Sequence, residues 1–121
     1  MVTMDLPAAV KSYQLGERAK TGLISISQLS LALAGFPEQE RPGGRRMLLL
    51  MMETFRAELQ YAATTTGHSE FRKAENALTE AISLVESNQP EQASKKIALA
   101  ISAATTPAQE AWQVLSEHGI L

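Results

Sequence analysis

The sequence predicts an all-α protein, an antiparallel bundle of four to five helices that forms a single domain over residues 1–121. Ala, Leu, Glu and Gln are prominent, and these residues lose little side-chain freedom in a helix. Apolar residues recur three or four positions apart along each long segment, which is the helical period. The length of 121 residues suits one domain with its own hydrophobic core.

The first helix is expected from about residue 7 to residue 34. Asp5 can cap its start, and Pro7 fits the first turn, where a missing N–H group costs nothing. Gly16 and Gly22 lower the helix propensity in the middle of this segment. The pattern therefore leaves open whether the segment is one helix or two.

A loop is expected over residues 37–44, because Pro and Gly are concentrated there, and a second helix from about Arg45 to Thr65. Residues 47–52 of this helix (MLLLMM) are apolar on all sides, whereas an ordinary surface helix has a polar face that is exposed to solvent. We therefore expect other helices, or a second copy of the protein, to surround this part of the chain.

A third helix is expected from about Glu70 to Ser87, with Ser69 as its cap. A fourth is expected from about Pro90 to Ala104, because Asn88 and Glu91 have the spacing of a capping box. The short connection between these two helices predicts a helical hairpin.

The last helical segment reaches about Glu117. Thr106 and Pro107 have the character of a helix start, and Gln109 completes a capping box with Thr106. Proline can also bend a helix without ending it, so a kinked continuation of the fourth helix is the alternative. Gly119 is expected to close the segment.

The charge and cysteine content exclude several classes of protein. The chain carries 11 Lys and Arg against 13 Asp and Glu, and this balance argues against a nucleic-acid partner. Residues 1–6 lack the basic and apolar regions of a secretory signal, and no apolar run reaches the roughly 20 residues of a membrane span. Cysteine is absent. We expect a cytoplasmic protein with no membrane partner.

No arrangement of residues predicts a catalytic site, a metal site or a cofactor. The chain lacks the glycine-rich phosphate and dinucleotide motifs and the serine-hydrolase motif. Its two histidines, His68 and His118, are not placed in the Glu-x-x-His pattern of di-iron bundles. We expect His68 to cap or solvate a turn and His118 to favour the negative end of its helix. The sequence leaves open whether the protein is an enzyme. The lack of a catalytic arrangement favours a protein that is not one.

Three arginines suggest a binding site for an anion. Arg41, Arg45 and Arg46 flank a Gly-Gly pair at an expected helix start, where free N–H groups also favour negative charge. The alternative is a solvated basic loop that Glu38 and Glu40 balance. On the first interpretation, the protein binds a small anionic ligand or is an enzyme acting on one.

The main functional hypothesis is a protein–protein interaction or assembly module, which would be an adaptor, a chaperone-like factor or a regulatory bundle. Its partner would be a second copy of the chain, in a homodimer, or another protein. The alternative for the methionines is a core filled by flexible side chains. The expected interface residues are Met47, Leu48, Met51, Met52, Phe55 and Trp112.

Overall fold

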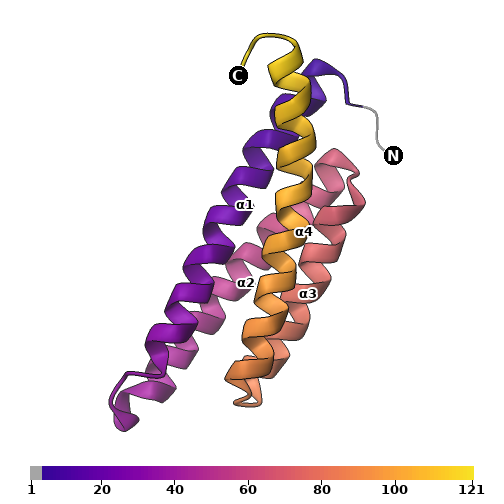
Figure 1. Ribbon diagram of the computed structural model, residues 1–121. Coiled ribbons are helices and arrows are strands. Elements are labelled where there is room, and N and C mark those ends of the chain that lie inside the picture. Colours follow the sequence, from indigo (N-terminus) through magenta and orange to yellow (C-terminus); the bar gives the residue numbers. More distant parts are fainter. Residues whose placement is uncertain (1–3) are drawn as a thin grey trace.

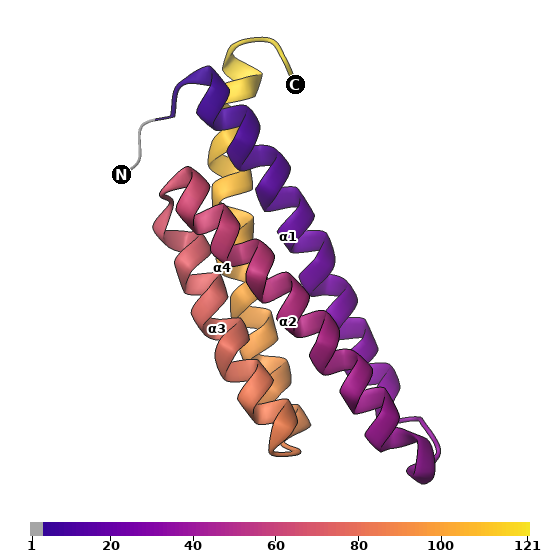
Figure 2. The same ribbon diagram turned by 180° about the vertical axis from the view of Figure 1, so that it is seen from behind.

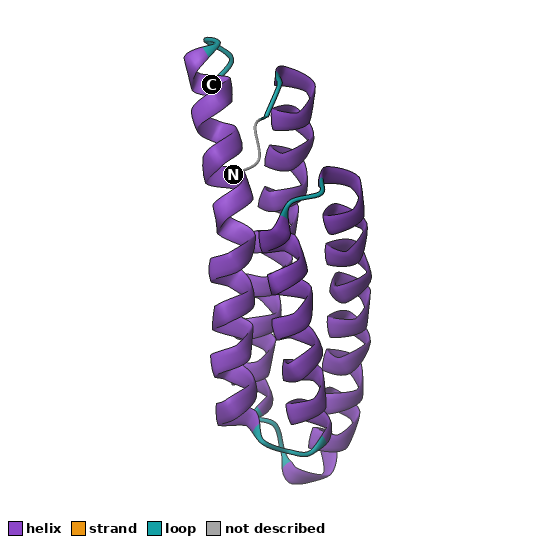
Figure 3. Ribbon diagram, turned by 90° about the vertical axis from the view of Figure 1, so that its right-hand side faces the viewer, coloured by secondary structure: helices purple, strands orange, loops and turns teal. Residues whose placement is uncertain are grey.

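The computed structural model describes residues 4–121, and these residues form a bundle of α-helices with no strand (Figures 1 and 3). The predicted all-α bundle is confirmed. Residues 1–3, which belong to the segment considered for a secretory signal, lie outside the described residues. The elements are α1 (Leu6–Leu33), the 3₁₀ turn η1 (Glu38–Glu40), α2 (Arg41–Thr66), α3 (Ser69–Glu86) and α4 (Pro90–Glu117).

The helices lie side by side along one long axis, and the chain reverses direction at each connection (Figures 1 and 2). α1 packs against α2 and α4, and α3 packs against the same two helices. None of the described helices combines the length and the apolar character that a membrane crossing needs. The core runs between the four helices, and its largest fully buried side chains are Phe71, Leu23, Ile26, Met52, Leu59, Leu78, Ile97 and Pro107.

α1 is one continuous helix, which settles the choice between one helix and two. The Asp5 carboxylate accepts a hydrogen bond from the Ala8 N–H at 2.8 Å, so the predicted cap is confirmed. Gly16 lies where α1 meets α4: a Cβ atom there would be 2.9 Å from the Cβ of Ala108. The glycine therefore permits a close helix–helix approach.

α2 begins at Arg41, so the prediction of a loop through residue 44 is wrong at its end. Pro42 occupies the first turn of α2, where proline is compatible with a helix. Gly44 is helical because it lies under Leu33 and Phe36: a Cβ on it would be 2.5 Å from Leu33 Cδ1. The packing of α1 on α2 overrides the weak helix propensity of glycine here.

The residue that caps the start of α3 differs from the prediction by one position. Gly67 ends α2 with a φ of 69°, a left-handed conformation that glycine adopts without strain. The cap of α3 is His68 and not Ser69. At the other end Asn88 has a φ of 58°, and Gln89 precedes α4 without a side-chain cap. The predicted capping box at the start of α4 is therefore wrong, because Asn88 serves the end of α3.

α4 continues through Pro107, so the prediction of a separate last helix is wrong and the alternative of a continued helix is correct. Pro107 is buried, and its neighbour Ala108 lies against Gly16 of α1. We attribute the continuity to this packing, which offsets the lost hydrogen bond and the clash of the proline ring with the Ala103 carbonyl, together a cost of about 3 kcal/mol. α4 ends at Glu117, just before Gly119, which has a φ of 71°.

Candidate functional site

The outer side of α2 carries a line of exposed apolar side chains. Met47, Leu50 and Tyr61 are 65%, 59% and 56% exposed. Spacings of three and four residues place them, with the small residues Thr54 and Ala57, on one side of the helix. We call this surface, together with the adjoining side of α1, the α1–α2 face. Its residues are Thr21, Ser25 and Leu29 of α1 and Met47, Leu50, Met51, Thr54, Phe55, Ala57 and Tyr61 of α2.

The contacts between α1 and α2 set the levels of these side chains along the bundle. Leu33 approaches Gly44, and the Phe55 ring covers Gly22. Because residues later in α1 meet residues earlier in α2, Leu29 lies near the level of residue 48. Leu29 is therefore at the same end of the face as Met47.

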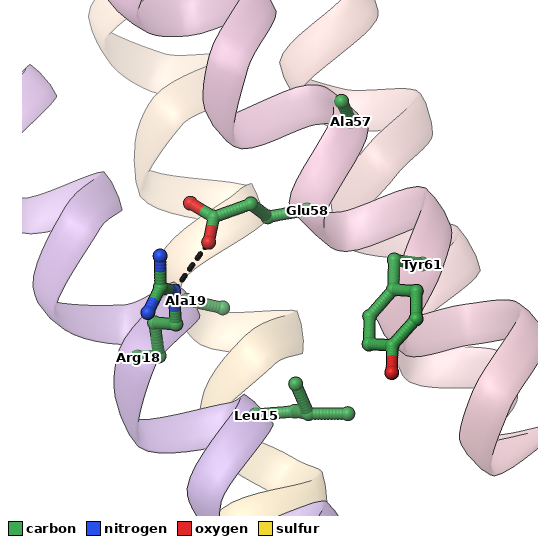
Figure 4. Close-up of a pocket in the computed structure, with 6 residues that line it drawn as sticks. All are labelled: Leu15, Arg18, Ala19, Ala57, Glu58 and Tyr61. Atoms are coloured by element: carbon green, nitrogen blue, oxygen red, sulfur yellow. Dashed lines mark hydrogen bonds and ion pairs between the residues drawn. The ribbon is translucent and has the colours of Figure 1, made fainter.

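Two charged groups beside the α1–α2 face neutralise each other. Arg18 of α1 forms an ion pair with Glu58 of α2 (Figure 4). Ion pairs within one helix occur on both α2 and α3: Arg56 with Glu53 on α2, and Arg72 with Glu75 and Lys73 with Glu70 on α3. The difference is that α3 exposes no large apolar side chain, whereas α2 exposes three in one line, which is typical of an interaction surface.

A hollow of about 360 Å³ opens between α1 and α2 beside the ion pair (Figure 4). We call it the Tyr61 hollow. Leu15 extends from α1 toward Tyr61 of α2, and Ala19 and Ala57 leave the space open because their side chains are small. Its lining residues are Leu15, Arg18, Ala19, Ala57, Glu58 and Tyr61.

The structure divides the six expected interface residues among three places. Met47, Met51 and Phe55 belong to the α1–α2 face. Leu48 and Met52 point into the core and are buried, so the expectation that they form an exposed interface does not fit their positions. Trp112 is half exposed, but it lies beside Tyr13 in a groove between α1 and α4, away from the other residues.

The three arginines of the expected anion site are also separated. Arg41 donates from Nε to the Phe36 carbonyl at 3.0 Å and from Nη2 to the Ala34 carbonyl at 3.4 Å, so it already neutralises the carbonyl end of α1. Arg41 and Arg45 line a hollow of about 220 Å³ with the turn between α3 and α4. Arg46 is exposed and is not part of that lining.

The sequence predicted only one of the two hydrogen bonds of the His68 ring. Its Nδ1 accepts a hydrogen bond from the Glu70 N–H at 3.1 Å, so the cap role is confirmed. Nε2 must then carry the proton, and it donates to Glu110 at 2.8 Å. His68 is buried and not solvated, and no local pattern links it to a residue of α4. His118 lies at the C-cap of α4, near the Val114 carbonyl.

Comparison with known proteins assigns no role to any of these residues. No family model, no curated protein and no solved structure matches the chain. Within residues 4–121 no three His, Asp or Glu side chains are grouped so that they could hold a metal ion. The function has to be inferred from the exposed surfaces and hollows described above.

Proposed function

We propose that this protein is an interaction or assembly module that associates with itself through the α1–α2 face. The observation that carries the proposal is the line of Met47, Leu50 and Tyr61, each more than half exposed on one side of α2. Burial of such side chains against a partner is the main favourable term in protein association. The same surface would serve an adaptor, a chaperone-like factor or a regulatory subunit.

The size of the α1–α2 face matches a weak, transient association. Its residues on α2, 47–61, span about 21 Å at a rise of 1.5 Å per residue. Two adjacent helices, each about 10 Å wide, give a face of roughly 420 Å². Specific protein–protein interfaces of standard size bury about 800 Å² on each partner, and transient encounters bury less.

Replacing Leu50 with glutamate is expected to weaken self-association at least about thirtyfold, the effect of losing one central contact of about 2 kcal/mol. A carboxylate in the buried centre of an interface loses its hydration without gaining a partner. The dimer dissociation constant is measured by sedimentation equilibrium of the full chain.

The matched control is Leu99→Glu. Leu99 is 56% exposed, close to the 59% of Leu50, but it lies on α4 beside the groove between α3 and α4. This variant should associate like the unchanged protein. Equal losses in the two variants would contradict the assignment of the α1–α2 face, and a protein that is monomeric at every concentration would refute self-association.

A second candidate function is the binding of a small anion at the hollow lined by Arg41 and Arg45. The observation in its favour is that Arg45 is half buried there and forms no ion pair with any residue in the described range 4–121. Asn88 and Gln89 add polar groups to the same lining. A phosphate or carboxylate group matches the planar donors of arginine.

Inorganic phosphate should raise the thermal stability of the unchanged protein but not of Arg45→Gln. A ligand present at about 100 times its dissociation constant stabilises the folded state by about 2.7 kcal/mol. The measurement is thermal unfolding in phosphate and in chloride at equal ionic strength. If phosphate has no effect beyond that of chloride, the anion-binding function is excluded for this ligand class.

A further inference from the structure

A hollow opens at the end of the bundle where the α1–α2 and α3–α4 hairpins stand apart. The connection between α1 and α2 and the turn between α3 and α4 both lie at this end (Figures 1 and 2). The hollow has a volume of about 220 Å³ and is lined by Arg45 of α2, so we call it the Arg45 hollow. Residues from the end of α1, the first two turns of α2, the end of α3 and the start of α4 complete its lining. All four helices thus contribute to one space.

The inner part of the Arg45 hollow is apolar. Leu48 and Val85 are core residues, only 3% and 6% exposed, that reach its wall. Leu33 of α1 and Pro90 of α4 add apolar surface to the same lining. The removal of such surface from water is favourable, so an aliphatic group placed against this wall stabilises a complex.

Arg45 is the lining residue that can bind an anion without giving up another partner. Arg41 also lines the hollow, but it already donates to the Phe36 and Ala34 carbonyls. Arg45 is half buried and forms no ion pair with any residue in the part of the chain that the structure describes. The lining residues, all of them described, include no Asp or Glu. One positive charge without a neighbouring acid matches a ligand that carries one negative charge.

The helix ends around the hollow favour an anion over a cation. α1 and α3 end here, and the carbonyl groups at a helix end carry partial negative charge. These carbonyls are already bonded, at the end of α1 by Arg41 and at the end of α3 by the N–H groups of residues 87–89. α2 and α4 begin here without a side-chain cap, so the partial positive charge of their first turns is not neutralised.

We infer that the Arg45 hollow binds a small aliphatic monocarboxylate. This inference rests on the second candidate function above, anion binding at this hollow, and names its ligand class. The guanidinium group of Arg45 is planar and pairs with both oxygens of a carboxylate. The aliphatic chain of the ligand then lies against Leu48 and Val85. Phosphate has no apolar part, so it would leave that wall in contact with water.

The volume of the hollow sets the length of the aliphatic chain. A water molecule occupies about 30 Å³ of the liquid, so 220 Å³ holds about seven non-hydrogen atoms of similar size. Pentanoate has this size, whereas acetate would fill only the part near the guanidinium group. The space is smaller than the roughly 300–1,000 Å³ of pockets for drug-sized ligands, which excludes a large ligand.

A titration of the full chain with acetate, pentanoate and pentanamide tests the ligand class. Binding is followed by the NMR chemical shifts of the backbone amides, at constant ionic strength in chloride. Each methylene group that leaves water strengthens binding up to about fourfold, and pentanoate has three more than acetate. Since the hollow is open on one side, we expect pentanoate to bind at least about tenfold more tightly than acetate. Pentanamide has the same length without the charge and should bind at least about tenfold more weakly than pentanoate.

Arg45→Gln and Arg46→Gln form a matched pair of variants. Arg46 is the next residue in the chain, but it is exposed and does not line the hollow. Both variants remove one positive charge, so a general effect of net charge is the same in the two. We expect the affinity for pentanoate to fall at least about tenfold in Arg45→Gln and to stay unchanged in Arg46→Gln. Circular dichroism checks that both variants are folded.

The outcomes separate this inference from the candidate function on which it rests. If acetate and phosphate shift the signals of the lining residues but pentanoate binds no more tightly than acetate, the ligand class is wrong and anion binding stands. If neither phosphate nor either carboxylate shifts these signals, both are refuted. Equal affinity for pentanoate and pentanamide, or equal losses in the two arginine variants, also overturns the inference. Pentanoate that binds most tightly and is lost only in Arg45→Gln supports both.

Discussion

Replacing Phe71 with alanine is expected to lower the free energy of unfolding by about 3–5 kcal/mol. Phe71 is completely buried in α3, and its ring packs edge-on against the His68 ring, with 6.2 Å between the centroids. Alanine would remove this apolar surface and leave a cavity that rigid neighbouring helices cannot close. The midpoint of thermal unfolding should fall by on the order of 15 °C.

Phe36→Ala is the control for this variant, because Phe36 is the same residue type and is partly exposed after α1. It should lose less than half as much stability. Both variants are measured by urea unfolding at one protein concentration, since the apparent stability of any self-associating protein depends on its concentration. Equal losses would contradict the central position of Phe71 in the core.

The second large effect is expected for Gly16→Leu, which should destabilise the protein by about 2–3 kcal/mol. Leucine has the better helix propensity, so an isolated α1 would gain stability from this change. In the bundle, a Cβ at position 16 already lies 2.9 Å from the Cβ of Ala108 and 3.1 Å from its backbone nitrogen. A larger side chain must therefore push α4 away from α1.

Gly43→Leu separates the loss of close packing from a general effect of glycine replacement. Gly43 is helical in α2, and a Cβ there meets nothing within 4 Å. This variant should change stability by no more than about 0.5 kcal/mol. Urea unfolding of Gly16→Leu and Gly43→Leu is the comparison, and a neutral Gly16→Leu would show that α1 and α4 are not in close contact at this point.

The helices were largely predictable because their signals are local. The helical period of apolar residues and the cap at Asp5 depend on residues within a few positions of each other. The same holds for Gly67, where the chain needs a left-handed conformation that glycine adopts without strain. These signals identified α1, α2 and α3 to within a few residues.

The errors at Gly44 and Pro107 have a common physical cause. Both residue types disfavour helices on average, and both are helical here because another helix packs closely against them or their neighbour. Leu33 covers Gly44, and Gly16 lies against the residue after Pro107. Such contacts join residues far apart in the chain, so a local pattern does not contain them.

The candidate surface was predictable only in part for a related reason. Residues 47–52 are apolar on every side, so the sequence cannot tell which side faces the core. The position of α1 decides that Met52 is buried and Met47 is exposed. The Tyr61 hollow depends in addition on the level at which Ala19 of α1 meets Ala57 of α2. This alignment depends on how α1 packs against α2, so no local sequence pattern reveals it.

The close contact of Gly16 with Ala108 has a consequence for the synthesis of the chain. These residues are 92 positions apart, and a ribosome adds about 5–20 residues per second. The nascent α1 therefore waits roughly 5 to 20 seconds for the part of α4 that covers it. In the first half of α1 the buried residues are Ala9, Ser12, Gly16 and Ala19, which offer little apolar area to chaperones or to neighbouring nascent chains. The larger buried side chains of α1, Leu23 and Ile26, follow in its second half, so the small residues confine the sticky surface of the nascent helix to that half.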